Sequence, residues 1–261
     1  MKNQILRFIR RKELQPLWEK LFHASKIGMN FWGGSSLFES GEIYAMHYAN
    51  EKLKKSNSIC VFDVGANVGE FATLAVKIFS SKKDIYSFEP SKFTFEGLNK
   101  RLKKNGIIEQ IKCFGFGFGS KNEQLTLYAS KAGLSAASIY KTNSENTIEY
   151  IEEIEIRTID NFCLENNINQ IDFLKIDIEG HEFQALLGAQ KMLEAKKIKF
   201  ILFEFGEFNI ISKTFFKDFY NLLGSNYKFY RVIPNGLREI ANYSTDLEVF
   251  NTINYLAELR D

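Results

Sequence analysis

Four ionisable side chains stand close together in the middle of the chain. Asp177, Glu179, His181 and Glu182 occupy four of six consecutive positions, directly after the mainly apolar segment 171–176. Open α/β sheets hold their ligands at the carboxyl ends of such strands, and ionisable groups crowded there are costly unless they serve chemistry. Histidine accepts a proton near neutral pH, and a hydroxyl becomes a good nucleophile only as a base removes its proton. We therefore predict that Asp177, His181 and Glu179 are catalytic.

Two more carboxylates are expected to face the substrate. Glu204 lies near the end of the apolar segment 198–205, and Glu182 begins the helix that follows the catalytic candidates. For Glu182 the alternative is that it only caps or solvates a helix end. Together with the catalytic candidates, Glu204 offers oxygen and nitrogen atoms of the kind that hold a divalent ion. Their spacing is not diagnostic, so a metal stays open but is not indicated.

A glycine-rich motif follows an earlier apolar segment. Residues 61–71 read VFDVGANVGEF, with Gly65 and Gly69 four positions apart. Gly65 permits a sharp turn after a strand, and Gly69 leaves room for the next helix to approach the sheet and a ligand. The backbone N–H groups at the start of that helix face an anion. Glu89 follows the segment 85–88, where a carboxylate can accept hydrogen bonds from both hydroxyls of a ribose.

Three classes of nucleotide-like ligand compete for this motif. A P-loop requires Gly-Lys-Ser or Gly-Lys-Thr, whereas Glu70 follows Gly69 here. A dinucleotide fingerprint requires glycines where this chain has Asn67 and Glu70. A ligand with an ammonium as well as a carboxylate fits better, because Asp63 and Glu70 would repel a pyrophosphate. S-adenosylmethionine is such a ligand; we expect it to contact Asp63, Gly65, Asn67, Gly69 and, through its ribose, Glu89.

The composition predicts an ordinary soluble enzyme. The chain has 261 residues, enough to bury a substantial core. Its 34 basic and 32 acidic residues give a net charge of +2, which demands no nucleic-acid partner. The three cysteines are far apart, and no secretory segment precedes the first charged cluster, so we expect a reducing cytoplasm. No apolar run approaches the roughly 20 residues that a membrane-spanning helix needs.

The positioning elements are predicted from residue 56 onward. Strand-like and helix-like segments alternate, which predicts an α/β domain over residues 56–261 with a doubly wound, mostly parallel sheet. Glycines interrupt a third strand at 111–118, because one face lies close either to a flat ligand such as adenine or to a tightly packed strand end. Asn235-Gly236 predicts an antiparallel hairpin between 227–233 and 237–240.

Two segments fall outside this regular pattern. Residues 1–55 are predicted to form a helical extension, with apolar residues at helical spacing and five basic residues in the first twelve positions. Such a helix either contacts an anionic membrane surface or a polyanionic glycan, or packs its apolar side on the core or on a second subunit. Residues 129–146 form a long polar stretch that is either a functional lid or a mobile excursion.

Five segments, in this order, resemble the FkbM family of S-adenosylmethionine-dependent methyltransferases: 63–69, 88–90, 157–160, 171–182 and 203–204. The most specific is KIDIEGHE at 175–182. The resemblance covers roughly residues 40–210 and implies a Rossmann-like class I methyltransferase fold ending in an antiparallel hairpin. It implies methylation of a hydroxyl on a sugar, glycan precursor or related natural product, in the setting of polysaccharide biosynthesis. It also places an adenine contact at Ser120, where relatives often carry an acid.

Two other functions remain as alternatives. One is methylation of a nitrogen or carboxyl group on a small molecule, since the cofactor motif says nothing about the acceptor. The other is a non-catalytic sugar-binding or assembly subunit, against which the intact carboxylates argue. In a methyltransferase the sulfonium methyl is already activated, so the protein mainly aligns the acceptor oxygen and excludes water. We expect Asp177 either to orient the acceptor hydroxyl or to hold the imidazole of His181, and a homo-oligomer stays open.

Overall fold

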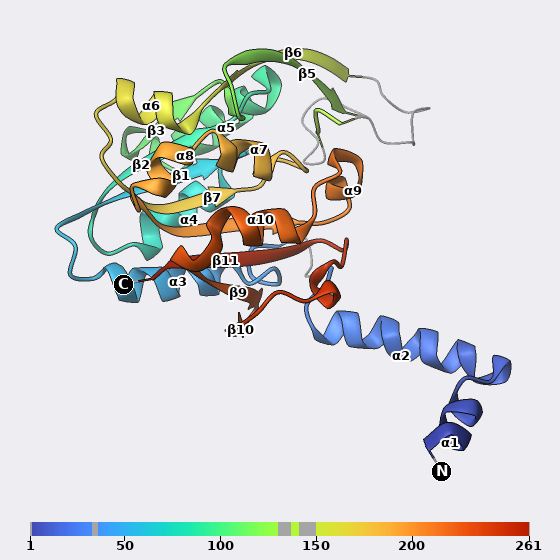
Figure 1. Cartoon of the computed structure of the whole chain (residues 1–261). Coiled ribbons are helices and arrows are strands. Elements are labelled where there is room, and N and C mark those ends of the chain that lie inside the picture. The colour runs from blue at the N-terminus through green and yellow to red at the C-terminus, as the bar shows by residue number, and fades with distance from the viewer. Residues whose placement is uncertain (1, 33–35, 130–136, 141–149, 261) are drawn as a thin grey trace.

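The computed structural model describes residues 2–32, 36–129, 137–140 and 150–260. An eight-stranded sheet with helices on both faces forms the centre of the molecule, and a three-stranded sheet lies at one end (Figure 1). The strand order of the large sheet is β10-β9-β11-β8-β7-β1-β2-β3, and that of the small sheet is β4-β6-β5. This mostly parallel arrangement confirms the predicted α/β class.

The elements have the following bounds. The large sheet consists of β1 (Ser58–Val64), β2 (Lys82–Phe88), β3 (Ile111–Phe114), β7 (Ile171–Ile176), β8 (Ile198–Phe205), β9 (Tyr227–Ile233), β10 (Gly236–Ile240) and β11 (Ile253–Leu259). The small sheet consists of β4 (Gly117–Phe118), β5 (Glu123–Ala129) and β6 (Tyr150–Arg157). The α-helices are α1 (Lys2–Ile9), α2 (Gln15–Gly28), α3 (Glu42–Leu53), α4 (Glu70–Ile78), α5 (Lys92–Lys104), α6 (Ile159–Glu165), α7 (Glu182–Leu187), α8 (Gln190–Glu194), α9 (Phe208–Ser212) and α10 (Phe216–Leu223). Short 3-10 turns are η1 (Lys12–Leu14), η2 (Ile108–Gln110), η4 (Gly224–Asn226) and η5 (Thr245–Leu247).

The middle of the sheet explains why the functional motifs end where they do. β1 pairs in parallel with both β2 and β7, and β7 pairs in parallel with β8. All six residues of β7 are buried, because helices cover both faces of the sheet. The carboxyl ends of these four strands therefore meet at one edge, and the polar residues that follow them are brought together there.

The third strand was predicted over residues 111–118, and this extent is wrong. β3 pairs with β2 and stops at Phe114, while β4 pairs with β6 in the small sheet. A Cβ atom at Gly117 would lie 3.0 Å from Cδ1 of Ile156, and one at Gly119 would lie 2.8 Å from Cγ2 of the same side chain. These two glycines are needed because β6 packs closely against the segment that leaves the large sheet.

The antiparallel end of the sheet was predicted only in part. The hairpin is confirmed, since β9 and β10 pair antiparallel across the Asn235-Gly236 turn. β11 was not predicted, yet it runs between β8 and β9 and pairs antiparallel with both. Six of its seven residues are buried, so its sequence lacks the apolar and polar alternation that identifies a half-exposed strand.

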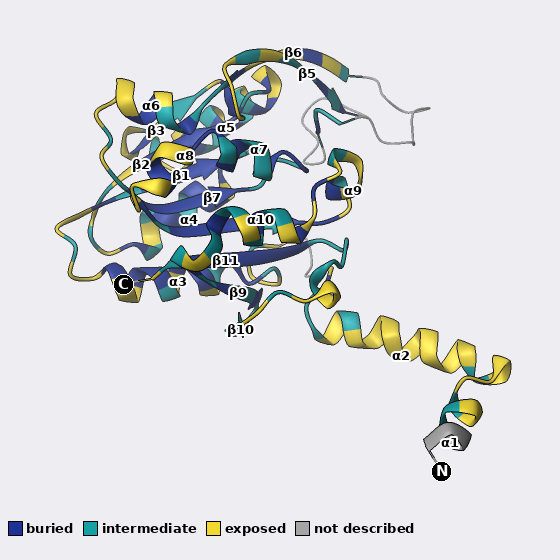
Figure 2. Cartoon of the chain, in the orientation of Figure 1, coloured by how far each residue is buried: buried dark blue, intermediate teal, exposed yellow. Residues whose placement is uncertain are grey.

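The predicted helical extension of residues 1–55 divides into two parts. α3 packs on the large sheet, with Ala45, Met46, Ala49 and Leu53 in its apolar core. α1 and α2 instead project away from the sheets, and α2 is exposed over almost its whole length (Figure 2). Among the described residues, no helix is both long and apolar enough to cross a membrane.

Candidate active site

One cavity joins the two predicted halves of the site. It has a volume of about 290 Å³ and lies where β1, β2, β7 and β8 end. Seven of the predicted site residues line it: Gly65, Asn67, Glu89, Asp177, Glu179, His181 and Glu204. Another part of the wall consists of apolar side chains from the small sheet, including Phe118, Leu127 and Ile156. The cavity is therefore polar at the sheet edge and apolar opposite it.

The loop after β1 is held in place by its neighbours. Gly65 has φ +78°, and a Cβ atom there would lie 1.9 Å from the carbonyl oxygen of Asp177, so only glycine fits. The backbone N–H of Asn67 donates to Oε2 of Glu89 at 2.9 Å, and the N–H of Ser91 donates to Oε1 at 3.1 Å. Burial raises the pKa of Glu89 to about 7, although these two N–H groups oppose the shift. Glu89 thus fastens the glycine loop to the end of β2.

A buried lysine supports the site from below. Nζ of Lys175 lies 3.6 Å from Oδ1 of Asp63 and 3.3 Å from Oδ2 of Asp177, and it donates to the carbonyl oxygen of Gly65 at 2.9 Å. Burial alone would lower the pKa of Lys175, but the surrounding carboxylates raise it above its ordinary value. Asp63 is fully buried and does not line the cavity. The predicted cofactor contact at Asp63 is therefore placed beneath the loop, as part of its support.

Sequence reasoning missed the structural role of Lys175. The signal was present, because a lysine in the middle of a strand buried on both faces requires a partner of opposite charge.

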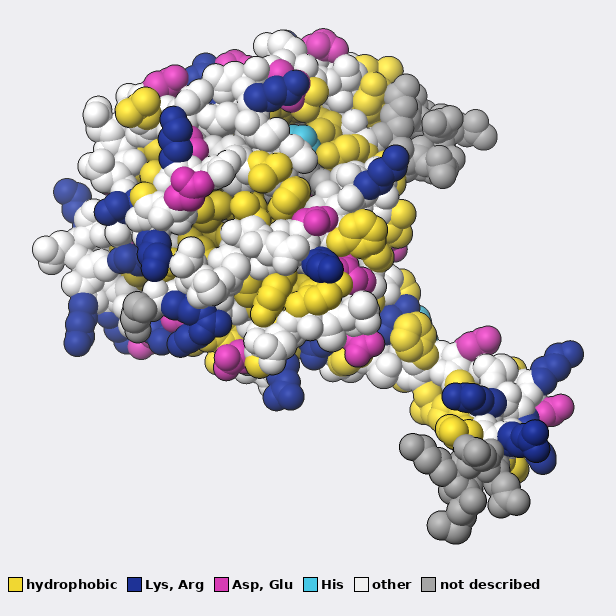
Figure 3. All heavy atoms as spheres, in the orientation of Figure 1, with side chains coloured by type: hydrophobic (Ala, Val, Ile, Leu, Met, Phe, Trp, Pro, Cys, Tyr) yellow, Lys and Arg dark blue, Asp and Glu magenta, His cyan; other side chains and the backbone are white. Residues whose placement is uncertain are grey.

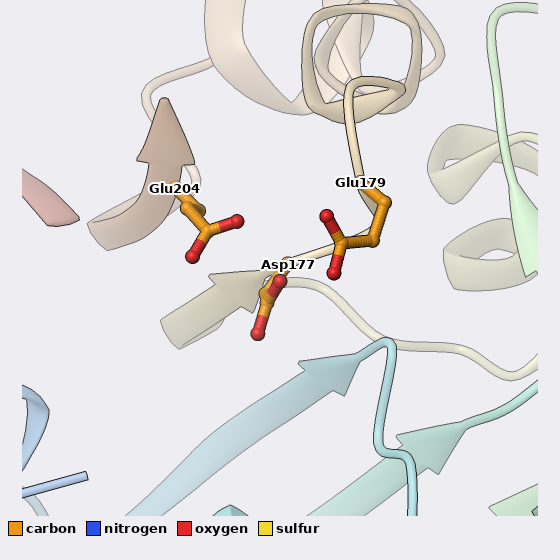
Figure 4. Close-up of side chains that lie close together, drawn as sticks. All are labelled: Asp177, Glu179 and Glu204. Atoms are coloured by element: carbon orange, nitrogen blue, oxygen red, sulfur yellow. The ribbon is translucent and has the colours of Figure 1, made fainter. Parts of the chain in front are cut away.

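Three carboxylates converge at the ends of β7 and β8. One oxygen each from Asp177, Glu179 and Glu204 lies within 4.8 Å of the other two, and Figure 4 shows the side chains around one common space. Burial and the negative charges of Asp177 and Glu182 raise the pKa of Glu179 to about 9. Burial and neighbouring carboxylates also raise the pKa of Glu204 well above its ordinary value. This part of the cavity favours a positively charged ligand.

A fourth carboxylate, also missed from the sequence, comes from α3. Glu42 lines the same cavity although it is only 4% exposed. Nδ2 of Asn254, from β11, donates to its Oε1 at 3.3 Å. Burial raises the pKa of Glu42 to about 8. No spacing rule connects a helix near the start of the chain with a strand near its end, so the sequence carried no signal for this pair.

His181 is held by a tyrosine. Nδ1 of His181 lies 3.1 Å from the hydroxyl oxygen of Tyr140. Holding the imidazole was one of the two roles predicted for Asp177, and Tyr140 is the residue found in that position. Burial lowers the pKa of His181 to about 4, because the charged imidazolium would lose its hydration. The imidazole is therefore neutral at neutral pH, and one of its ring nitrogens has a lone pair that accepts a hydrogen bond.

The predicted lid reaches the cavity where it is described. Ala137, Ser138 and Ile139 line the cavity, and the Ser138 hydroxyl donates to the carbonyl oxygen of Glu179 at 2.8 Å. Within 129–146, residues 130–136 and 141–146 lie outside the described part of the chain. Glu179 has φ +51°, and the Ser138 contact helps to hold this left-handed conformation.

Glu182, predicted to face the substrate, supports the loop before it. It is 1% exposed and absent from the cavity wall. Its Oε1 accepts hydrogen bonds from the N–H groups of Ile178 at 2.9 Å and Gly180 at 3.1 Å. The predicted alternative, that Glu182 caps a helix end, therefore describes its contacts better. Glu182 affects the site by holding the backbone on either side of Glu179.

Two further cofactor candidates also lie away from the cavity. A Cβ atom at Gly69 would lie 2.6 Å from Cδ1 of Leu98, so this glycine permits α4 and α5 to pack together. Ser120 lines a separate surface depression with Thr158 and Asp160. Neither residue lines the cavity.

The fold and cavity together define a Rossmann-like class I methyltransferase architecture. Its features are a mostly parallel sheet ending in antiparallel strands, a glycine turn after β1 and a carboxylate at the end of β2. A profile described as "Methyltransferase FkbM domain" matches residues 63–231. The chain belongs to the FkbM methyltransferase family, which confirms the predicted resemblance and a methyltransferase domain.

Curated relatives are distant. The chain is 24% identical over 147 residues to "Hexuronic acid methyltransferase AglP" of Haloferax volcanii, covering 55% of this chain and 54% of the relative. It is 21% identical over 168 residues to "2-O-methyltransferase NoeI" of Sinorhizobium fredii, covering 59% of this chain and 66% of the relative. The chain thus spans about half the length of the first of these and about two thirds of the second.

A solved structure of a family member is also similar. The methyltransferase FkbM from Methylobacillus flagellatus KT aligns with a TM-score of 0.45 at 18% sequence identity, covering 77% of this chain and 44% of that one.

Proposed function

We propose that the protein is an S-adenosylmethionine-dependent O-methyltransferase that methylates a hydroxyl of a sugar, glycan precursor or related natural product. The carrying observation is that a single cavity holds both Glu89, at the end of β2, and the polar group formed by Asp177 and His181, after β7. A cofactor and an acceptor bound there would lie side by side. The names of two relatives, a hexuronic acid methyltransferase and a 2-O-methyltransferase, support a sugar hydroxyl as the acceptor.

The donor groups of the cavity fit the cofactor. The Glu89 carboxylate has lone pairs left for the two ribose hydroxyls after accepting its two backbone N–H groups. Pro90, Phe118 and Ile156 supply an apolar wall for an adenine ring. The excess of carboxylates suits a ligand that carries a sulfonium and an ammonium. When bound, S-adenosylmethionine supplies a methyl group that needs no further activation.

The remaining chemistry falls to the side chains at the end of β7. Asp177 orients the acceptor hydroxyl. The ion pair with Lys175 holds the carboxylate of Asp177 in place. His181, kept neutral by burial and held by Tyr140, accepts the hydroxyl proton as the new C–O bond forms. The apolar wall and the segment 137–140 exclude water, which would otherwise compete for the polar groups.

The proposal extends to the setting of the reaction. Cys60, Cys113 and Cys163 are all free, which agrees with a reducing cytoplasm. A sugar acceptor places the protein in the biosynthesis of a polysaccharide or a related glycan.

Calorimetry and a transfer assay test this function. We expect the full chain to bind S-adenosylmethionine and not NAD, and to transfer a labelled methyl group to hexuronic acids, nucleotide sugars or oligosaccharides. His181→Ala should lower the transfer rate by roughly 10²–10⁴-fold and leave cofactor binding intact, whereas Glu96→Gln, at an exposed position on α5, should change neither. Binding of NAD in preference to S-adenosylmethionine would refute the proposal. Transfer only to nitrogen or carboxyl acceptors would refute the hydroxyl assignment.

A further inference from the structure

The acidic wall of the cavity gathers more carboxyl groups than the protein pairs with cations. Asp177, Glu179 and Glu204 have oxygens within 4.8 Å of one another. Among the described residues, Lys175 is the cation that forms an ion pair with one of these three, Asp177, and it is shared with Asp63. No ion pair or side-chain hydrogen bond within the described part of the chain involves the carboxylate of Glu204. The three residues are partly buried, so their carboxylates repel one another where water screens them incompletely, and a cationic ligand would relieve this repulsion.

Glu42 provides a second, independent observation. It comes from a different element, α3, and it is more than nine-tenths buried while lining the same cavity. Its Oε1 accepts from Asn254, but its Oε2 has no hydrogen-bond partner among the described residues. A buried polar atom without a partner costs about 1–3 kcal/mol and calls for an explanation. A hydrogen-bond donor located in the cavity would satisfy it.

We propose that Asp177, Glu179 and Glu204 bind one divalent cation of the Mg²⁺ or Mn²⁺ class, and that Glu42 accepts a hydrogen bond from a water molecule on that cation. The donor set consists only of carboxylate oxygens, which such hard cations prefer. These ions keep several of their waters when bound to a few carboxylates. A water-mediated contact therefore explains why Glu42 faces the group from outside the cluster of three.

A monovalent ammonium explains the arrangement less well. When ionised, Asp177, Glu179, Glu204 and Glu42 carry four negative charges. The lysine that pairs with Asp177 carries one positive charge and also pairs with Asp63. A double positive charge neutralises more of this excess than an ammonium does. Glu204 lies on β8, whereas Asp177 and Glu179 lie in the turn after β7. The backbone of that turn is held by Glu182 and Ser138, which fixes where the oxygens converge.

The consequence for catalysis rests on the proposed function. A cation at the ends of β7 and β8 lies on the acceptor side of the cavity, because Glu89 marks the ribose side at β2. It would hold neighbouring hydroxyl oxygens of a sugar and polarise the one that is methylated. His181 would remain the proton acceptor, since its ring is held by Tyr140 and is not part of the cluster.

The test measures Mn²⁺ binding directly, without substrate or cofactor. Electron paramagnetic resonance titration of residues 1–261 should show one Mn²⁺ per chain that Mg²⁺ displaces. Glu204→Gln should weaken Mn²⁺ binding by at least about 100-fold, and Glu42→Gln by about tenfold, as for residues that hold a metal-bound water. Glu207→Gln, an exposed glutamate beside the end of β8, is the matched control and should leave the affinity unchanged. Circular dichroism of each variant establishes that it is folded.

The outcomes separate this proposal from the proposed function. Absence of Mn²⁺ binding at millimolar concentration, or unchanged affinity in Glu204→Gln, overturns the metal site; transfer that continues in a chelator would then leave the methyltransferase function standing. Mn²⁺ binding in a chain that binds no S-adenosylmethionine would support the metal site and refute the cofactor assignment. If Glu42→Gln weakens S-adenosylmethionine binding and not Mn²⁺ binding, the role given to Glu42 is wrong.

Discussion

Two regions of this molecule depart from the usual distribution of side chains, in opposite directions. The sheet edge buries charged groups, among them Asp63, Lys175 and Glu42, in an interior that is otherwise apolar. The helices α1 and α2 instead expose large apolar side chains, including Phe8, Leu21 and Phe22. A buried charged group is informative because it needs a partner or a ligand. An exposed apolar surface is informative because removing it from water stabilises the protein. We call the first the buried region and the second, helices α1 and α2, the outward region.

The outward region also differs in charge. Residues 2–28 contain seven basic and two acidic residues, whereas the whole chain has a net charge of only +2. Figure 3 shows Lys, Arg and hydrophobic side chains together on the projecting helices. Lys26 lies 4.9 Å from the ring centre of Phe22, and Arg11 lies 5.0 Å from that of Phe8. From basic and apolar groups side by side on a helix we expect contact with an anionic membrane surface, with a second copy of the chain as the alternative partner.

The largest predicted effect breaks the buried region. Lys175→Met leaves Asp63 in the core without its partner cation, so we expect the free energy of unfolding to fall by about 3–5 kcal/mol. Urea denaturation followed by circular dichroism measures this change. Lys112→Met removes a lysine from the exposed pair with Asp84 and should cost no more than about 1 kcal/mol. Equal losses in the two variants would mean that the buried pair contributes no more than a surface pair.

The next effect separates catalysis from cofactor binding. We expect His181→Ala to lower kcat by roughly 10²–10⁴-fold, the range for loss of a general base, with little change in the dissociation constant of S-adenosylmethionine. Tyr140→Phe keeps the ring and removes the hydroxyl that contacts Nδ1, so it should lower kcat less. Single-turnover kinetics with labelled cofactor measures both. A larger loss in Tyr140→Phe than in His181→Ala would contradict the assigned roles.

Cofactor binding should respond to the other end of the cavity. Glu89→Gln loses the negative charge that faces the ribose, which is worth about 1.5–3 kcal/mol for a hydrogen bond to a charged group. We therefore expect the dissociation constant of S-adenosylmethionine to rise by about tenfold or more, as measured by calorimetry, with Mn²⁺ binding retained. An unchanged dissociation constant would place the ribose elsewhere.

The smallest effect on stability belongs to the outward region. Leu21 and Phe22 are 49% and 62% exposed, so the double substitution Leu21→Ser and Phe22→Ser should change the free energy of unfolding by less than about 0.5 kcal/mol. The same variant should lose most of the co-sedimentation that we expect of the parent chain with vesicles containing phosphatidylglycerol. If the parent chain does not co-sediment with such vesicles and instead self-associates through the apolar side chains of α2, the partner of this region is a second copy of the chain.

Prediction from the sequence succeeded where the signal is local. The glycine turn, the carboxylates after β2 and β7, and the β9–β10 hairpin all depend on residues a few positions apart. It failed where distant segments meet: β4 joined a second sheet, β11 entered between β8 and β9, and Asn254 met Glu42 across most of the chain. Glu182 and Asp63 were identified as important, but their supporting role beneath the site was visible only from their burial.

By itself, the sequence determined the α/β class, the family and the strand ends that carry chemistry, because side-chain periodicity and glycine turns are set by neighbours along the chain. The tertiary structure decided which of those polar groups share a cavity. That outcome depends on strand order and on helix packing, which place Glu42, Asp177, Glu179 and Glu204 around one space although they are spread over 163 positions of the chain. Burial there removes water from the carboxyl groups, and this loss of hydration, which no local pattern encodes, raises the pKa values of Glu42, Glu179 and Glu204.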